Sequence, residues 1–223
     1  MRSKVANEFH RFPILDGLET LYAQQHRTIF PFHTHPTFNI SLVLEQTFHT
    51  KLQSHTAFAP AGAIVITHPE EIHSTICDSQ TGSRFFTFYI APGVLSFLNR
   101  QQPVYFKQTV IIDPVLFEKL FRLSARLKEN AATQEQELLQ LLAELVRKYA
   151  GVAPVMAQPA LLLAPQMEPD LFEKFSLEKI ARNSGLDKYS YIRRFKKETG
   201  LTPNHYVTLR RIEKAKELLH TGA

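Results

Sequence analysis

The feature that most constrains the fold is a stretch near the C-terminus, residues 175–203, which reads FSLEKIARNSGLDKYSYIRRFKKETGLTP. Its pattern predicts two short helices joined by a tight turn. Ser176 and Asp187 are placed to cap the first and second helix, because short polar side chains accept hydrogen bonds from the free N–H groups of a first turn. Gly185 ends the first helix where only glycine turns without steric cost, and Gly200 ends the second.

The second predicted helix, Lys188–Glu198, has two different faces. Tyr191 and Phe195 lie four residues apart and should pack against the first helix. The opposite face is basic, and a helix of this kind fits the major groove of DNA, where arginine can donate two hydrogen bonds to guanine. We expect base edges to be contacted by Tyr189, Ile192 and Arg193. We expect the DNA backbone to be contacted by Lys188, Ser190, Lys196 and Lys197. A basic, solvated helical hairpin is the alternative interpretation.

The stretch resembles the first helix-turn-helix of the AraC/XylS family of transcription regulators. The resemblance covers about 50 residues and rests on the segments SLEKIA and GLDKYSYIRRFKKETGLTP, followed by Tyr206, Arg211, Ile212, Ala215, Leu218 and Leu219. Arg194 departs from the family pattern, which usually has an apolar residue there. The family pattern implies that a helix over residues 204–219 leads to a second helix-turn-helix, which we expect to be missing because the chain ends at Ala223.

Charge and cysteine content restrict the class of protein further. Residues 170–223 hold 12 Lys and Arg against 7 Asp and Glu, so their net charge of +5 equals that of the whole chain and favours a polyanionic partner for this part. No apolar run approaches the roughly 20 residues that span a membrane, and the N-terminus lacks the apolar core of a signal peptide. With a single cysteine, Cys77, these features favour the cytoplasm and exclude a disulfide framework.

Residues 18–91 are predicted to form a mostly antiparallel β-barrel. Short segments rich in β-branched and aromatic residues alternate with Pro, Gly, His and Ser. The predicted strands are Leu18–Gln24, Phe38–Leu44, Thr47–Leu52, Ile64–Thr67, His73–Ile76 and Arg84–Ile90. The last strand is apolar on both faces, as expected inside a barrel or sandwich. Residues 1–17 are expected to be a loosely ordered arm.

Two segments inside this region resemble the two sequence motifs of a cupin, a small jelly-roll barrel. They are HTHPTFNISLVLE, residues 33–45, and PAGAIVITHPEEIHS, residues 60–74. Regulators of the AraC/XylS family commonly have a cupin-like sensor domain, so the two resemblances agree. They imply a barrel that binds a small-molecule effector and needs no other cofactor.

The candidate pocket residues are His33, His35, Asn39, Glu45 and His73. In metal-binding cupins the first motif supplies two histidines and a carboxylate and the second supplies one histidine; here Asn39 stands at the carboxylate position. We expect these side chains to hydrogen-bond a small ligand in a largely apolar cavity, or to be structural. A divalent transition metal held by His33, His35 and His73 is the alternative.

Beyond the barrel the hydrophobic period changes to that of helices. Val115, Leu116, Leu120, Leu123 and Leu127 form one stripe, residues 135–149 form a second, and Asn130–Gln134 connects them. These helices bury their stripes against the barrel or, as the family resemblance implies, against a second copy in a homodimer. Residues 151–169 are rich in proline and read as a semi-rigid linker.

The predicted fold class is α+β, with four parts. Residues 1–113 form the arm and sensor barrel, 114–150 a helical hairpin, 151–169 the linker, and 170–223 the DNA-binding domain. The function expected is an effector-responsive, sequence-specific regulator that binds double-stranded DNA without a membrane partner and is not an enzyme. Two alternatives stay open: a metal-dependent cupin enzyme, and a truncated sensing and dimerisation module that does not bind DNA alone.

Overall fold

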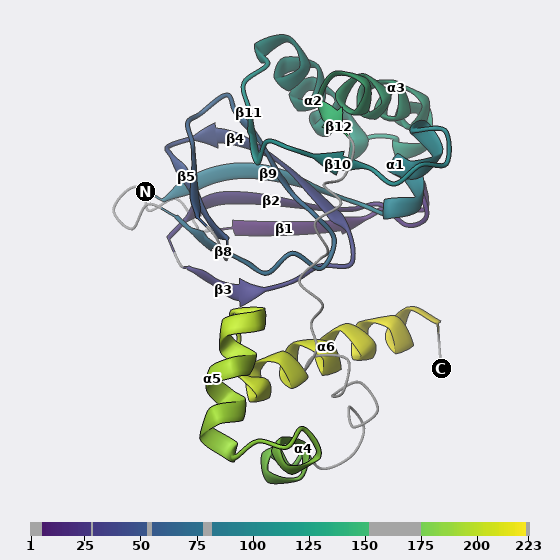
Figure 1. Ribbon diagram of the computed structural model, residues 1–223. Coiled ribbons are helices and arrows are strands. Elements are labelled where there is room, and N and C mark those ends of the chain that lie inside the picture. The colour runs from purple at the N-terminus through teal and green to yellow at the C-terminus, as the bar shows by residue number, and fades with distance from the viewer. Residues whose placement is uncertain (1–5, 28, 53–54, 78–81, 152–174, 222–223) are drawn as a thin grey trace. The chain divides into compact units, whose positions relative to one another are not determined.

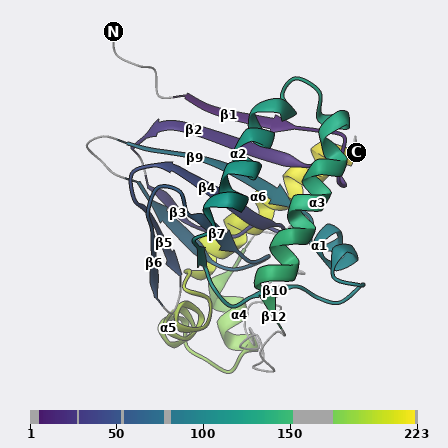
Figure 2. The ribbon, with the colours of Figure 1, turned by 90° about the horizontal axis from the view of Figure 1, so that it is seen from above.

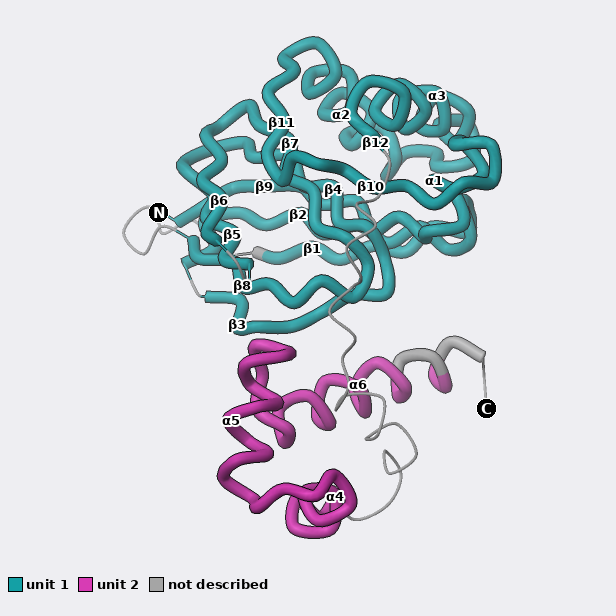
Figure 3. Tube along the Cα trace, viewed as in Figure 1, with its two compact units in different colours: residues 1–153 teal, residues 154–223 magenta. Residues whose placement is uncertain are grey.

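The computed structural model describes residues 6–27, 29–52, 55–77, 82–151 and 175–221. The chain divides into two compact units, residues 1–153 and 154–223 (Figure 3). The first unit combines antiparallel sheets with three helices and the second is helical, so the fold class is α+β, as predicted. The linker predicted for residues 151–169 lies, apart from Gly151, outside the described residues.

Two sheets facing each other form the barrel of the first unit (Figure 1). The six-stranded sheet has the order β1-β2-β9-β4-β7-β11 and the four-stranded sheet the order β3-β8-β5-β6, with antiparallel pairing throughout. The strands of the six-stranded sheet are β1 Ala6–Arg11, β2 Glu19–His26, β4 Phe38–Glu45, β7 Ile64–Thr67, β9 Ser83–Ile90 and β11 Val110–Ile111. The strands of the four-stranded sheet are β3 Phe30–His33, β5 Phe48–Leu52, β6 Thr56–Ala59 and β8 His73–Ile76.

The six-stranded sheet has two buried faces because its strands alternate between two apolar environments. On β9, Phe86, Phe88 and Ile90 join the core beneath the helices, while alternate residues of the strand face the barrel interior. The helices α1 Pro92–Leu98, α2 Pro114–Leu127 and α3 Ala131–Tyr149 supply the other side of that core. Figure 2 shows α2 and α3 lying across the strands of this sheet.

The two predicted helices after the barrel are present, and their apolar stripes pack on the barrel of the same chain. Leu120 and Leu145 are both fully buried in the core shared with the sheet. The expected connection at Asn130–Gln134 is wrong, because Asn130 caps α3 and the helix begins at Ala131. Val115, expected in the buried stripe, is 62% exposed, since it occupies the first turn of α2 on the outward side.

All six predicted strands are confirmed to within a few residues, and several elements were not predicted. The arm expected over residues 1–17 is wrong in part, because β1 pairs with β2 as an edge strand. The short strands β3 and β6 and helix α1 lacked a long enough hydrophobic pattern. The pair β10 Tyr105–Phe106 and β12 Ala150–Gly151 joins segments far apart in sequence, so no local pattern marks it.

The second unit contains α4 Leu177–Asn183, α5 Lys188–Thr199 and α6 Pro203–Thr221. Ser176 and Asp187 cap α4 and α5 as predicted, and Gly185 and Gly200 have φ angles of +67° and +76°. The core joins the buried side chains of the three helices, which are Ile180, Ala181, Tyr191, Phe195 and Val207. These contacts confirm the predicted helix-turn-helix.

The apolar residues of α6 are only partly buried. Near its start Tyr206 contacts Phe195, with ring centroids 5.5 Å apart. Further along, Ile212 is 49% exposed and Leu219 is 83% exposed. None of the helices within the described ranges has the length and apolar character needed to cross a membrane.

Candidate effector pocket and DNA-contacting helix

A cavity of about 40 Å³ lies between the two sheets of the barrel. The six-stranded sheet contributes the inward residues of β2, β4, β7 and β9, and the four-stranded sheet contributes those of β3, β5 and β8. The lining residues are Leu21, Phe30, His33, His35, Asn39, Ser41, Phe48, Thr50, Val65, Thr67, His73, Thr75, Phe85, Thr87 and Tyr89. In this measure one water needs about 10–15 Å³, so the cavity has room for about three waters.

The lining is more polar than the sequence predicted. We expected an apolar cavity with few polar groups, but hydroxyl, amide and imidazole side chains predominate among the lining residues. Ser41 and Thr87 face each other on neighbouring strands, with their hydroxyl oxygens 2.8 Å apart. Among the described lining residues there is no aspartate, glutamate, lysine or arginine. The cavity therefore offers hydrogen-bonding groups and imidazole nitrogens.

Two of the predicted histidines have a defined tautomer. His73 Nδ1 lies 2.8 Å from the carbonyl oxygen of Glu71, and His33 Nδ1 lies 2.6 Å from that of Pro31. A carbonyl oxygen can only accept, so both Nδ1 atoms are protonated and donate, and in the neutral form of either ring Nε2 is the acceptor nitrogen. Burial, with the neighbouring His33, lowers the pKa of His73 to about 4, so this ring is neutral at pH 7.

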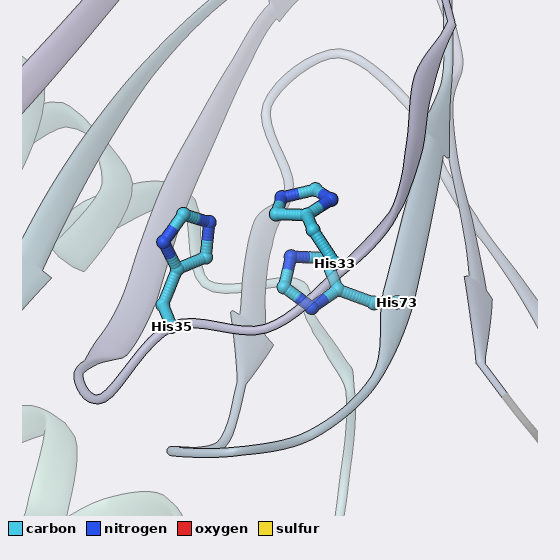
Figure 4. Close-up of side chains that lie close together, drawn as sticks. All are labelled: His33, His35 and His73. Atoms are coloured by element: carbon cyan, nitrogen blue, oxygen red, sulfur yellow. The ribbon is translucent and has the colours of Figure 1, made fainter. Parts of the chain in front are cut away.

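The three histidines converge, as the sequence predicted (Figure 4). The loop between β3 and β4 presents His35 beside the other two, and one nitrogen from each ring lies within 4.8 Å of the others. The ring centroid of His33 is 4.7 Å from that of His35 and 4.4 Å from that of His73. Tyr89 on β9 packs against His35 with centroids 5.0 Å apart.

The other two predicted pocket residues have different positions. Asn39 is buried, and its amide nitrogen lies 3.4 Å from His73 Nε2. Glu45 does not line the cavity. It stands at the end of β4, exposed, where its carboxylate accepts a hydrogen bond of 2.6 Å from Arg84. The β-bulge between Val43 and Glu45 interrupts the alternation that would direct position 45 inward.

The donor set fits a divalent transition metal in part. Three imidazoles are ligands suited to such ions, and backbone carbonyls orient two of the rings through Nδ1, as outer partners of metal-bound histidines do. An amide replaces the carboxylate at Asn39, which removes a negative charge from the set. His33, His35 and His73 would therefore be the residues that hold such an ion.

The basic helix of the second unit presents most of the predicted DNA-contacting side chains to solvent. Tyr189 is 70% exposed, and Arg193, Lys196 and Lys197 are exposed beside it, while Ile192 is half-buried. Asp187 holds the first turn by accepting from the backbone N–H groups of residues 189 and 190, at 2.9 and 3.0 Å. The helix thus has a capped start and a basic outer face.

Three basic side chains on this helix make local contacts. Lys188 pairs with Glu178 on α4 at 2.6 Å, and Arg193 donates to the hydroxyl of Ser190 at 3.1 Å. Arg194, where the family pattern has an apolar residue, is exposed and pairs with Glu198 at 2.9 Å. Arg194 therefore lies at the rim of the helical core and needs no buried partner.

Several pocket residues were missed by sequence reasoning. Ser41, Thr67, Thr75 and Thr87 line the cavity but had been read only as parts of strands. A signal was present: Ser41 follows Asn39 by two positions, so both side chains face the same side of the strand. The same period assigns Thr87 and Tyr89 to one face of β9.

Comparison with protein families and known structures agrees with this architecture. Residues 17–153, more than half of the chain, match the AraC-like ligand binding domain. Residues 171–208 match the bacterial regulatory helix-turn-helix proteins of the AraC family. The two matches correspond to the barrel with its helices and to the helix-turn-helix.

Individual relatives give the same assignment. The HTH-type transcriptional regulator YbfI of Bacillus subtilis (strain 168) is 26% identical over 207 residues, covering 86% of this chain and 74% of YbfI. The fold is similar to apo ToxT K231A from Vibrio cholerae, with a TM-score of 0.55 at 10% identity, over 92% of this chain and 83% of ToxT. The chain belongs to the AraC family and is a transcription regulator with a ligand-binding domain and a helix-turn-helix DNA-binding domain.

Proposed function

We propose that occupancy of the barrel cavity by a small polar effector controls DNA binding by α5. The observation behind this proposal is the cavity between the two sheets, into which donor and acceptor groups of both sheets converge and whose described lining has no Asp, Glu, Lys or Arg. A ligand can shift the regulator between two states only if it binds one state better than the other. A cavity joining two sheets meets that requirement, because its occupant contacts both and favours the arrangement in which they fit it.

The cavity volume limits the effector. Pockets for drug-sized ligands enclose about 300–1,000 Å³, far more than the roughly 40 Å³ found here. An effector that enters without rearrangement has only a few heavy atoms. The lining supplies hydroxyl, amide and imidazole groups, so we infer a small polar molecule as its class. Since no carboxylate lines the cavity among the described residues, we propose sensing and not catalysis as its role.

A divalent transition metal ion is a second candidate for the occupant. The convergence of His33, His35 and His73 within 4.8 Å favours it. When bound, such an ion supplies a positive charge and fixed ligand directions. The protein's part is to orient the rings, which the carbonyl groups of Pro31 and Glu71 do for two of them, and to keep His73 neutral by burial.

At the DNA, we propose that Tyr189, Arg193 and the exposed edge of Ile192 contact bases. Lysine and serine side chains at the margins of the same face would contact phosphates, and they are Lys188, Ser190, Lys196 and Lys197. Supporting this role, the face is exposed and basic while the opposite face is committed to the helical core. The protein would act in the cytoplasm, where both DNA and effector are available.

We further propose that the regulator is a homodimer. Small helix-turn-helix proteins commonly bind DNA in pairs on two half-sites. Because the apolar stripes of α2 and α3 are buried on their own sheet, a contact through this hairpin would use the outward side. Val115, in the first turn of α2, is an apolar residue exposed on that side, with 62% of its surface accessible. Sedimentation equilibrium of the full chain and of Val115→Glu tests the proposed homodimer. A full chain that is monomeric at all concentrations contradicts it.

Two measurements on the full chain test the proposed function. Selection from randomised duplex DNA, followed by mobility shift at one fixed salt concentration, should yield a preferred sequence. If a metal ion is the occupant, calorimetric titration with Ni²⁺ and Zn²⁺ should show binding that His35→Ala removes and that His49→Ala, outside the cavity on β5, leaves intact. Heat from neither ion, with no metal in the purified protein, would exclude the metal candidate and leave the small-molecule effector.

A further inference from the structure

A continuous set of hydrogen bonds begins at the pocket and leads away from it through the loop after β7. His73 donates from Nδ1 to the carbonyl oxygen of Glu71 at 2.8 Å. The carboxylate of Glu71 accepts from the backbone N–H of His68 at 2.9 Å and lies 3.3 Å from His68 Nδ1. The residue just before this loop, Thr67, also lines the cavity. Both ends of the segment 67–73 therefore touch the site that the effector would occupy.

His68 connects this loop to β10. The backbone N–H of Phe106 donates to His68 Nε2 at 3.0 Å. Because that nitrogen accepts, the ring proton lies on Nδ1 and points to the Glu71 carboxylate, so both ring nitrogens are used by one tautomer. The ring also stacks on Tyr105 with centroids 4.8 Å apart and meets the edge of Phe38 at 5.6 Å. His68 is thus fixed on both its edge and its faces.

Strand β10 in turn holds the C-terminal end of the described part of the first unit. Tyr105 pairs with Gly151, and Phe106 pairs with Ala150. The N–H groups of consecutive strand residues point to opposite sides, so β10 can bond His68 on one side and β12 on the other. Gly151 is the last described residue before 152–174, where the chain continues toward the DNA-binding unit.

We propose that the Glu71–His68 pair couples the state of the cavity to the point at which the chain leaves the sensor domain. This inference rests on the proposed function, because it names the route by which an occupant of the cavity reaches the linker. A ligand that binds His73 and displaces its ring also displaces the Glu71 carbonyl, which is hydrogen-bonded to that ring, and so shifts the loop. The loop moves His68, and the β10–β12 pair tightens or loosens. The Glu71–His68 pair therefore acts by positioning β10 and β12, and it contacts no ligand itself.

Spatial adjacency alone does not show coupling, so the test uses paired substitutions. The readout is the hydrogen-exchange protection of the Gly151 amide in the full chain, measured by NMR. His73→Ala removes the donor to Glu71 and should lower this protection about five-fold, the effect expected for loss of one ordinary hydrogen bond. His73→Asn can still donate from its amide to the same carbonyl and should keep most of the protection.

The second arm breaks the route at its centre. His68→Phe keeps the ring stacking on Tyr105 but removes both nitrogen contacts. In that background His73→Ala should cause no further change at Gly151, which a merely structural role of His73 does not predict. Ser41→Ala, a cavity substitution on the other sheet, is the matched control and should leave Gly151 unchanged. If His73→Ala does not fold, Glu71→Ala, which keeps its backbone carbonyl, supplies the perturbation.

Two results would overturn the inference. One is unchanged protection of Gly151 in folded His73→Ala, and the other is an additive effect of the two substitutions. Either can occur while DNA binding and effector binding are intact, in which case only the route fails. Conversely, coupling between the cavity and Gly151 without any effector-dependent change in DNA affinity supports the route and refutes the proposed function.

Discussion

Replacing Arg193 with alanine should weaken DNA binding most strongly at one base pair of the preferred sequence. The guanidinium group lies on the exposed face of α5 and makes one exposed hydrogen bond, to Ser190 at 3.1 Å. That exposed hydrogen bond contributes little to stability, so Arg193 can readily exchange it for a hydrogen bond to a base. A forked arginine–guanine contact contributes about 1–3 kcal/mol of discrimination, which corresponds to about 5- to 160-fold in affinity at 25 °C.

The adjacent arginine provides a matched control. Arg194→Ala removes the same charge from the same helix, but this side chain is turned about 100° away and pairs with Glu198 at 2.9 Å. Both substitutions should therefore lower affinity for unrelated DNA to a similar small extent. Loss of the exposed Arg194–Glu198 pair costs only about 0.5 kcal/mol of helix stability. Any larger difference in DNA affinity between the two variants is therefore due to the position of Arg193 on the helix.

The assay is fluorescence anisotropy with the selected duplex, its single-base variants and a scrambled duplex, all at one salt concentration. The wild-type chain should discriminate at several positions, and Arg193→Ala should lose discrimination at one of them. If Arg193→Ala and Arg194→Ala weaken every duplex equally, the assignment of Arg193 to a base is refuted. If Arg194→Ala loses the single position instead, the orientation of α5 on DNA is wrong.

Three further results are expected. Asp113→Ala should lower the free energy of unfolding of the first unit by about 2 kcal/mol in urea titrations. The reason is that the Asp113 carboxylate caps α2 at Leu116 and accepts a hydrogen bond from Tyr149. Asp113→Ser keeps a capping oxygen and should lose about half as much free energy. The cap and these partners lower the pKa of Asp113 from 3.8 to about 2, so its contribution is present above pH 4 and should disappear as the pH falls from about 4 to about 2, unlike in Asp113→Ser. Phe195→Ala, at a fully buried position, should cost about 3–5 kcal/mol and abolish DNA binding without moving the unfolding transition of the first unit, as circular dichroism and mobility shift will show.

The helix-turn-helix could be predicted closely because its determinants are local. Ser176 and Asp187 are capping residues, Gly185 and Gly200 occupy backbone conformations that other residues adopt at a cost, and the apolar period defines the buried face. Each of these acts within a few residues of its own position. The sequence therefore contains nearly all the information needed for α4, the turn and α5.

The strands of the barrel could be predicted from the sequence, but the face that lines the cavity could not. The alternation within β4 and β9 indicated two buried faces, yet nothing local told which face was the cavity and which met the helices. That assignment depends on which sheet covers which, a non-local property. Glu45 was placed in the pocket by its position in the cupin-like motif, and the bulge before it turns the side chain outward to Arg84.

The elements that escaped prediction are those defined by partners far away in sequence. β1 is a short polar strand that exists because β2 offers it an edge. The pair of β10 and β12 joins positions more than 40 residues apart through two residues each. The convergence of His33, His35 and His73, by contrast, was predictable because the family motif already encodes it.

The two-residue period of β9 separates two structural roles on one strand. Phe86, Phe88 and Ile90 pack in the core beneath the helices, whereas Thr87 and Tyr89 line the cavity. Substitutions at the cavity positions can alter what the barrel accepts while the helix layer keeps its packing. If the cavity is the proposed effector site, libraries randomised at Ser41, Thr67 and Thr87 are a practical way to obtain variants of this scaffold that respond to other small molecules.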